Sequence, residues 1–289
     1  MPIGESELIL NADGSIYHLN LLPQDISSTI IVVGDPNRVG QVSQYFDSIE
    51  VKKQKREFLT HTGHLKGKRL TVLSTGIGTG NIDIVLNELD ALANIDFSTR
   101  EVKRELQSLN IIRIGTSGAI QPDIPVDSFI VSEYGIGLDG ILHFYAKEKI
   151  ECHEMTQSLL THLEWESNGI VPYTAECDSS LKNLLHSNRI QLGITVTNAG
   201  FYGPQGRELR LPIKIKDFHS KLASFHFQNK PITNLEMETA TIYGLSKLLG
   251  HKAVSLNAIL ANRPLGTFSE NPRRTIDELI QLTLGLLTK

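Results

Sequence analysis

Arg113 stands where this chain could bind an oxyanion. It interrupts the apolar run 111–114, and Thr116 and Ser117 follow it between two glycines. A guanidinium buried in such a run is costly without an anionic partner, and the hydroxyl and backbone N–H groups after it add donors that suit an oxyanion. No acidic residue lies near it in the sequence. The segment therefore fits an oxyanion site and an internal salt bridge equally well.

Two further arginines are weaker candidates for binding an anion. Gly34 ends the apolar run 30–33, and a glycine there lets the backbone approach a ligand. Arg38 arrives four residues later, either as an anion ligand or as a surface residue after a turn. Arg56 lies in the charged run 52–58 and by itself indicates a solvated face.

Glu236 and Glu238 open an apolar stretch that we interpret as a helix. On a helix, residues two apart point in different directions, so the two carboxylates are not expected to act as a pair. A single glutamate at a helix start can accept two hydrogen bonds from a vicinal diol such as that of ribose. It can equally compensate the positive end of the helix dipole.

The loop 201–207 carries groups that match a pyrimidine ring. The Gln205 amide both donates and accepts, as an N–H beside a carbonyl requires. Arg207 can donate to a second carbonyl, and Phe201 can stack on the ring. An ordinary loop rich in glycine and proline is the alternative.

Other chemistries lack their motifs. The segment 75–80 resembles a dinucleotide-binding turn, but the fingerprint needs glycine where Asn81 stands. The ten histidines show no metal-binding spacing, and neither cysteine lies in a nucleophile motif. His18, near the start of the chain, is expected to be a partly buried, satisfied histidine.

Short β-branched runs alternate with helical patterns along the chain. The runs are predicted as buried strands and lie at 30–33, 70–73, 111–114, 129–131, 192–196 and 254–260. Apolar residues at helical spacing predict helices at 82–93, 237–248 and 276–287, the last preceded by Pro272. This alternation predicts an α/β layered fold with a parallel or mixed sheet, and sites in such folds form at the carboxyl ends of the strands.

Composition limits the function classes. The 289 residues carry a formal net charge of −4 without a basic cluster, which argues against nucleic-acid or membrane-surface binding. No apolar stretch is long enough to span a membrane, no signal peptide is visible, and two cysteines fit a reducing compartment. We expect one domain covering 1–289 and a cytoplasmic location.

Taken together, these segments resemble the nucleoside phosphorylase I family, and within it the uridine branch. The matching segments occur in the family's order, and they are GDPNRV (34–39), REF (56–58), TGIG (75–78), RIGTSGAIQP (113–122), FYGPQGR (201–207), LEMETAT (235–241) and NR (262–263). The resemblance implies a three-layer α/β/α sandwich with a central mixed sheet, assembled as a homohexamer whose dimers share their sites.

The resemblance also implies roles for individual residues. Phosphate would be bound by Gly34, Arg38, Arg113 and Thr116, and by Arg56 from the partner subunit. Ribose would be bound by Thr116, Met237 and Glu238, and by the partner's His18 at the 5′-hydroxyl. Uracil would contact Ser117, Gly118, Phe201, Gln205, Arg207 and Leu260. Arg113, Arg207 and Glu238 would carry the catalysis.

Two departures from the family pattern stand out. Relatives of the uridine branch hold a potassium ion at the dimer interface, and the matching positions are Glu57, Ile77 and Asn81, where asparagine replaces serine. The 201–207 loop exchanges glycine and proline relative to the common order and has Gly206 for glutamate, while Gln205 and Arg207 keep their places.

The implied activity is a pentosyl transfer: reversible phosphorolysis of uridine, and of deoxyuridine or thymidine, with inorganic phosphate as co-substrate and no required cofactor. Replacing Arg113 is expected to cost most. A purine nucleoside phosphorylase is one rival, but the segment 260–263 lacks the aspartate that would protonate a purine. A nucleosidase, which would not need the arginine set, and a non-catalytic nucleoside-binding protein are the others.

Overall fold

The computed structural model describes residues 2–164, 169 and 171–289. Its main sheet has the strand order β11-β12-β10-β8-β13-β7-β1-β4-β3-β2, with β9 paired to β8 and β14 to β13. The strands are β1 (Thr29–Val33), β2 (Ser48–Lys55), β3 (Phe58–Leu65), β4 (Lys68–Ser74), β7 (Asn110–Ala119), β8 (Phe129–Leu138), β9 (Tyr173–Glu176), β10 (Ile190–Asn198), β11 (His226–Phe227), β12 (Lys230–Glu236), β13 (Lys252–Asn262) and β14 (Thr267–Phe268). A separate small pair comprises β5 (Ile95–Asp96) and β6 (Glu101–Val102).

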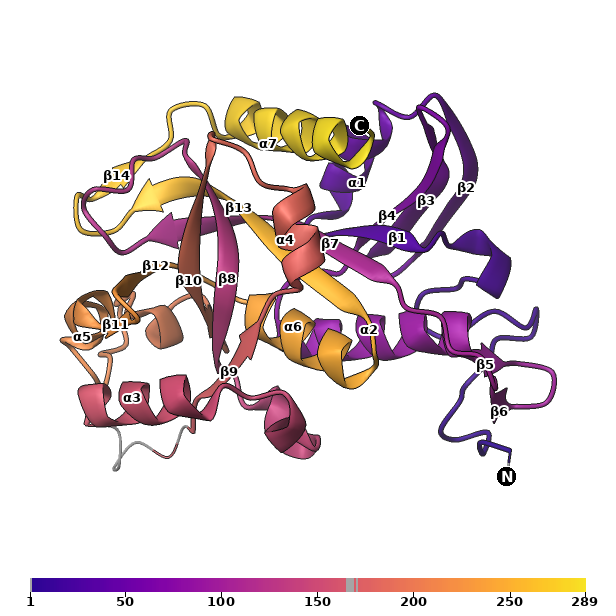
Figure 1. Cartoon of the computed structure of the whole chain (residues 1–289), viewed down its shortest axis with the longest axis horizontal. Helices are drawn as coiled ribbons and strands as arrows, with labels where there is room; N and C mark the ends of the chain where they lie inside the picture. The colour runs from indigo at the N-terminus through magenta and orange to yellow at the C-terminus, as the bar shows by residue number, and fades with distance from the viewer. Residues whose placement is uncertain (1, 165–168, 170) are drawn as a thin grey trace.

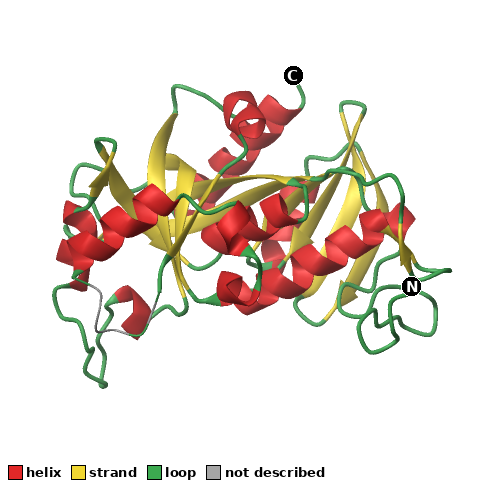
Figure 2. Ribbon diagram, turned by 60° about the horizontal axis from the view of Figure 1, so that its bottom comes forward, coloured by secondary structure: helices red, strands yellow, loops and turns green. Residues whose placement is uncertain are grey.

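Helices lie on both sides of the sheet (Figures 1 and 2). In the view of Figure 1, α7 and α1 lie above it, and α2 and α6 lie side by side below it. The α-helices are α1 (Pro36–Ser43), α2 (Thr79–Asn94), α3 (His153–Leu163), α4 (Ser179–Leu184), α5 (Phe218–Ser224), α6 (Thr239–Leu248) and α7 (Pro272–Leu287), and the 3-10 turns are η1 (Pro23–Asp25), η2 (Ile141–Phe144), η3 (Lys147–Lys149) and η5 (Gly203–Gln205).

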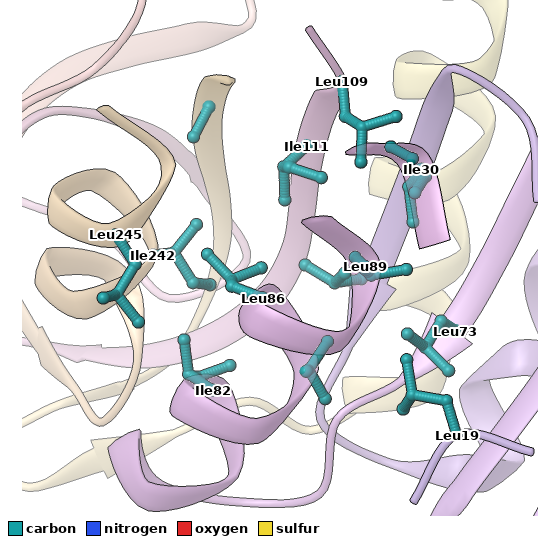
Figure 3. Packing of buried hydrophobic residues seen from close by; sticks show 14 of the residues in the cluster. Leu19, Ile30, Leu73, Ile82, Leu86, Leu89, Leu109, Ile111, Ile242 and Leu245 are labelled. Carbon is teal, nitrogen blue, oxygen red and sulfur yellow. The ribbon is translucent and has the colours of Figure 1, made fainter. Parts of the chain in front are cut away.

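Strands β1 and β7 are buried on both faces, which explains their continuous apolar runs. Ile30 and Ile111 belong to one core cluster, with the apolar side of α2 and α6 (Figure 3). Their sequence neighbours Ile31 and Ile112 belong to a second cluster on the opposite face, which includes side chains of α1 and α7. Burial on both faces fixes the register of these strands and hence the position of everything that follows them.

Part of the sheet closes on itself. Strand β12 pairs in parallel with β10 and also pairs antiparallel with the end of β7, where Asn234 lies opposite Ala119 and Leu235 opposite Gly118. With β13 and β8 completing the circuit, five strands form a ring. The closure brings the end of β7 beside the end of β12, although the two are far apart in the sequence.

The structure confirms the α/β class with a mixed sheet flanked by helices, and every predicted strand is present with longer bounds. The ring closure is not visible in the sequence pattern. The prediction that a helix begins at Glu236 was wrong, because β12 continues through Glu236 and α6 begins only at Thr239. The charged run 52–58 belongs to the β2–β3 hairpin. None of the described helices is long and apolar enough to cross a membrane.

Gly137→Ala tests the packing of the Tyr173 ring of β9 against β8. A Cβ at this position would lie 2.0 Å from Cζ of the Tyr173 ring. The ring cannot move freely, because the Tyr173 hydroxyl donates to Asp139 (2.6 Å) and contacts Thr241 (2.8 Å). We expect the substitution to lower the free energy of unfolding by about 1–3 kcal/mol, measured in urea.

Gly285→Ala is the matched control. It lies in α7 with open space where the Cβ would be, so the free energy of unfolding should rise by about 0.5–1 kcal/mol. Equal effects of the two substitutions would contradict this account of the ring's packing.

Candidate functional site

A cavity of about 750 Å³ opens at the carboxyl ends of β1, β4, β7 and β12. Most of the residues singled out from the sequence line it. They are Gly34, Arg38, Glu57, Ile77, Asn81, Arg113, Thr116, Ser117, Gly118, Phe201, Gln205, Arg207, Met237, Glu238 and Leu260. Parallel strands end at the same edge of a sheet, so residues that follow separate strands meet there.

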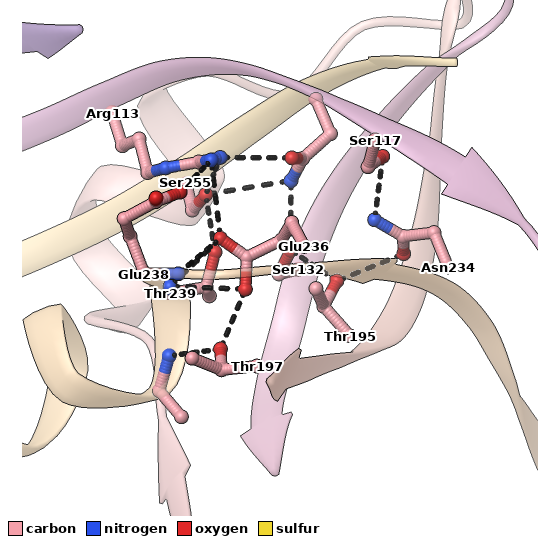
Figure 4. A network of polar contacts seen from close by, with 12 residues as sticks. Arg113, Ser117, Ser132, Thr195, Thr197, Asn234, Glu236, Glu238, Thr239 and Ser255 are labelled. Carbon is pink, nitrogen blue, oxygen red and sulfur yellow. Dashed lines mark hydrogen bonds and ion pairs between the residues drawn. The ribbon is translucent and has the colours of Figure 1, made fainter. Parts of the chain in front are cut away.

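Arg113 belongs to a buried polar network (Figure 4). Its Nη2 donates to Glu238 Oε2 at 2.6 Å and lies 3.1 Å from Glu236 Oε2, while Nη1 donates to Asn257 Oδ1 at 2.8 Å. Burial opposes the charge of Arg113, but Glu236 and Glu238 outweigh that effect and raise the pKa of the guanidinium. Arg113 therefore forms the internal salt bridge that the sequence allowed, and this salt bridge lies at the wall of the cavity.

The two glutamates do act on one partner, contrary to the expectation that they would diverge. Glu236 is the last residue of β12, and in an extended chain residues two apart share a face. Glu236 compensates the start of α6, accepting hydrogen bonds from the backbone N–H groups of Glu238 (2.8 Å) and Thr239 (2.9 Å). Burial raises the pKa of Glu236, with Arg113 lowering it and Glu238 adding to the rise. Both glutamates line the cavity, but Glu238 is the one that does not bind the backbone at the start of α6.

Glu238 is itself held from two sides. Its Oε2 accepts from Arg113, and its Oε1 accepts from the backbone N–H of Gly78 at 2.8 Å. Gly78 has φ of 93°, a conformation that favours glycine. The TGIG segment thus serves to bend the chain toward Glu238, and not to bind a dinucleotide. Each carboxylate oxygen has a second lone pair, so Glu238 retains acceptor capacity.

Arg38 carries a positive charge that the described residues leave without an ion-pair partner. Helix α1 begins at Pro36 after the Asp35 side chain caps Asn37, and this places Arg38 8% exposed against the cavity. Its Nη1 donates to the Ile114 carbonyl at 3.3 Å, and its Nε has no partner among the described residues. Burial and the positive charge of Arg113 lower the pKa of Arg38, against Asp35 and Glu238. An anion between the two arginines would relieve both effects.

The 201–207 loop forms a separate polar cluster on the cavity wall. Arg207 donates to Gln205 Oε1 (2.6 Å) and to the Phe201 carbonyl (2.7 Å), and its guanidinium lies 3.7 Å from the centre of the Phe201 ring. Burial, then the nearby charge of Arg263, lowers the pKa of Arg207 to about 10. With Oε1 engaged, the Gln205 Nε2 is the amide atom left to donate, since no described residue accepts from it.

His18 and Arg56 do not line the cavity of their own chain. The His18 Nδ1 lies 2.6 Å from Glu88 Oε1, in keeping with a partly buried, satisfied histidine. Arg56 occupies the β2–β3 turn with φ of 55°. Both lie beside Tyr17, with the His18 ring centroid at 4.8 Å and the Arg56 guanidinium at 5.9 Å from the Tyr17 ring centroid.

Glu57, Ile77 and Asn81 all line the cavity. Glu57 and Asn81 form a hydrogen-bonded pair, and the Ile77 side chain beside them is exposed. Asn81 Nδ2 donates to Glu57 Oε1 at 3.2 Å, and Ile77 is 72% exposed. Within the described part of the chain, no group of three or more His, Cys, Asp or Glu side chains could hold a metal ion.

Sequence reasoning missed several contributors to the site. Ser255 and Asn257 hold Arg113 from β13, and Asn234 donates to the Ser117 hydroxyl at 2.9 Å. Arg263 donates to the Gln205 carbonyl at 3.3 Å. The available signal was polar residues at alternate positions of an apolar run, as at 255 and 257.

Comparison with known proteins gives a consistent result. The sequence profile described as Phosphorylase superfamily matches residues 28–287. A uridine phosphorylase of Thermococcus kodakarensis is 30% identical over 259 residues, which cover 89% of this chain and 81% of the relative. A DeoD-type purine nucleoside phosphorylase of Shewanella frigidimarina is 26% identical over 276 residues, which cover 92% and 96%. A crystal structure described as a Trypanosoma brucei nucleoside phosphorylase that shows uridine phosphorylase activity superposes with a TM-score of 0.88 at 28% identity, covering 97% of this chain and 99% of that chain.

The unpaired charge of Arg38 predicts that an oxyanion stabilises the protein. At a phosphate concentration one hundred times the Kd, the gain should be about 2.7 kcal/mol, which raises the melting temperature by about 5 °C. Thermal unfolding in phosphate and in chloride of equal ionic strength measures the difference. Arg38→Gln should lose most of the shift.

Arg189→Gln is the control, because it removes an exposed arginine paired with Glu278. It should keep the phosphate shift of the unsubstituted protein. An undiminished shift in Arg38→Gln would mean that phosphate binds elsewhere.

Proposed function

The chain belongs to the phosphorylase superfamily, and we propose that it catalyses the reversible phosphorolysis of uridine, and of deoxyuridine or thymidine, yielding uracil or thymine and a pentose 1-phosphate. The observation that carries the proposal is the unpaired, buried Arg38 beside Arg113 at the cavity wall. A family relative that cleaved nucleosides with water would have no use for that charge. The uridine phosphorylases among the relatives support the choice of nucleoside.

Phosphate binds, in this proposal, between Arg38 and Arg113, where Thr116 and the backbone at Gly34 add neutral donors. Both guanidinium groups are almost fully buried, so the low local dielectric strengthens their attraction for the dianion. Ribose lies next to it, with the vicinal hydroxyls donating to Glu238 and the Met237 side chain against the sugar. The 2.6 Å hydrogen bond between Arg113 and Glu238 supports adjoining sugar and phosphate sites.

Uracil occupies the part of the cavity lined by Phe201, Gln205 and Arg207, with Ser117, Gly118 and Leu260 completing its walls. Phe201 is half exposed and presents its ring to a planar ligand. The free Gln205 Nε2 donates to one carbonyl of the base. Arg207, held close to the Gln205 side chain, donates to the other.

Catalysis then rests on position and electrostatics. A phosphate oxygen bonds to C1′ as the C1′–N1 bond breaks, and the bonding electrons leave with N1 of uracil. The sugar passes through an oxocarbenium-like state that the phosphate charge stabilises. Arg207 stabilises the negative charge that grows on uracil, and the proton carried by the phosphate ends on the free base. Arg113 and Glu238 hold the two reactants in line, and no covalent bond to the protein forms.

The proposed active unit is a dimer, further assembled as a homohexamer, acting in the cytoplasm. Arg56 and His18 lie outside their own cavity, and each of them lies beside Tyr17. In a dimer that shares its sites, Arg56 would reach the partner's phosphate and His18 the partner's ribose 5′-hydroxyl. The free cysteines Cys152 and Cys177 agree with a reducing compartment.

A potassium ion at Glu57, Ile77 and Asn81 is the one part of the family pattern that these residues fit poorly. The Asn81 amide turns its N–H toward Glu57, whereas a cation site needs oxygen ligands. No step of the proposed reaction uses the ion. Replacement of potassium by sodium in the assay is therefore expected to leave the rate unchanged.

The deciding experiment is ultraviolet measurement of uracil release from uridine, with and without phosphate. Release that requires phosphate supports the proposal. Release without phosphate would make the protein a nucleosidase and remove the assigned role of Arg38. Release of hypoxanthine from inosine, in place of uracil from uridine, would make it a purine nucleoside phosphorylase, and nucleoside binding without turnover would make it a binding protein.

The dimer is tested by complementation of two inactive variants, Arg38→Gln and Arg56→Ala. Co-expression in equal amounts should restore activity, because mixed dimers contain one cavity with both native arginines, and with random pairing about one quarter of all cavities are of this kind. Activity no higher than the sum of the separate variants would mean that Arg56 does not serve a partner's site.

A further inference from the structure

The imidazole of His219 packs directly under the loop that lines the proposed base site. His219 lies in α5, and Gly206 opposite it has φ of 63°. A Cβ on Gly206 would lie 3.1 Å from His219 Nε2 and 3.2 Å from Cε1. Gly206 stands between Gln205 and Arg207 in the chain, so the ring supports the residue that joins the two side chains assigned to uracil.

The surroundings of His219 favour its neutral form. Its Nε2 is buried and has no hydrogen-bond partner among the described residues. Burial lowers the pKa of His219, and the positive charges of Arg263 and Arg207 lower it further, while hydrogen bonding to the Gln205 backbone opposes them. The two charged groups that lower the pKa of His219, Arg263 and Arg207, are thus both cations.

Arg207 and Arg263 both hold Gln205 in place. Arg207 donates to the Gln205 side chain and Arg263 to the Gln205 carbonyl. Burial lowers the pKa of both arginines. A third positive charge beneath Gly206 would therefore repel the two groups that fix Gln205 in place.

We propose that His219 is a positioning residue for the base-binding loop, holding Gln205 and Arg207 in the geometry that reads the pyrimidine only while its ring is neutral. The inference rests on the proposed function. Because the pKa of His219 is lowered in the folded protein, the loop geometry is stable above pH about 6.5 and is lost as the pH falls below that ordinary value. The phosphate site, formed by other elements, is not affected by this proton.

The test compares the unsubstituted protein with His219→Phe between pH 7.5 and pH 5.5. Phenylalanine keeps an aromatic ring that cannot be protonated. It loses the hydrogen bond to the Gln205 backbone, so the comparison uses the pH dependence of the KM and not its value at a single pH. In the unsubstituted protein the KM for uridine should rise about tenfold over this range, the equivalent of about 1.4 kcal/mol. In His219→Phe the KM should change by less than about twofold over the same range, and kcat and the KM for phosphate should follow the same pH profile in both proteins.

Two further variants separate positioning from folding. His219→Ala removes the support, so the KM for uridine should already be about tenfold higher at pH 7.5, with the KM for phosphate unchanged. His226→Phe makes the same replacement at an exposed histidine of β11 and should keep the native pH profile. Phosphate-induced thermal stabilisation, retained in all variants, shows that each is folded.

The outcomes are distinct. A native-like rise in the KM for uridine in His219→Phe, or a pH profile of the KM for phosphate that differs between the two proteins, would overturn the role of His219. Failure of the unsubstituted protein to release uracil at any pH would instead overturn the proposed function.

Discussion

The burial of one guanidinium between two carboxylates is the interaction on which the rest of the site depends. Arg113 joins β7 to Glu236 at the end of β12, to Glu238 before α6 and to Asn257 on β13. Loss of Arg113 would leave two carboxylates uncompensated in the protein interior, and such a loss is far more costly than the ion pair is stabilising. The network therefore stabilises one arrangement of the strand ends. Because one carboxylate is used for the helix start, the other remains available to a ligand.

The closed ring of strands explains how that network can exist. Pairing of Leu235 with Gly118 sets the end of β12 against the end of β7, and Asn234 fixes the contact by donating to Ser117. In an open sheet with the same strand order, three strands (β10, β8 and β13) would separate β12 from β7. Closure thus converts residues from distant parts of the chain into adjacent walls of one cavity.

Much of the fold and most of the cavity could be predicted from the sequence, and the failures have physical reasons. Burial on both faces makes β1 and β7 conspicuous as apolar runs; Gly34 directly follows β1, and Thr116 lies in the second half of β7. The resemblance of short motifs to a family supplied Arg38 and Met237, which no local pattern distinguishes. The divergence expected for Glu236 and Glu238 was wrong because a helical period was applied where the chain is still extended. His219 packs against Gly206, a glycine with positive φ that lies 13 positions earlier in the chain. Neither composition nor residue spacing predicts such a contact.

The order of the strands also bears on how the molecule avoids aggregation through the edges of its sheet. Ring closure pairs β12 on both sides, so of the two ends of the sheet one is the two-residue β11 and the other is β2. Strand β2 is long enough to template an added strand, but it carries Lys52, Lys53 and Lys55. An intruding β2 from another molecule would set lysines against lysines, and such like-charge edges are a recognised defence against aggregation. The same positive edge ends at the Arg56 turn, so the charges that discourage fibril growth also border the arginine that we propose reaches a partner's phosphate.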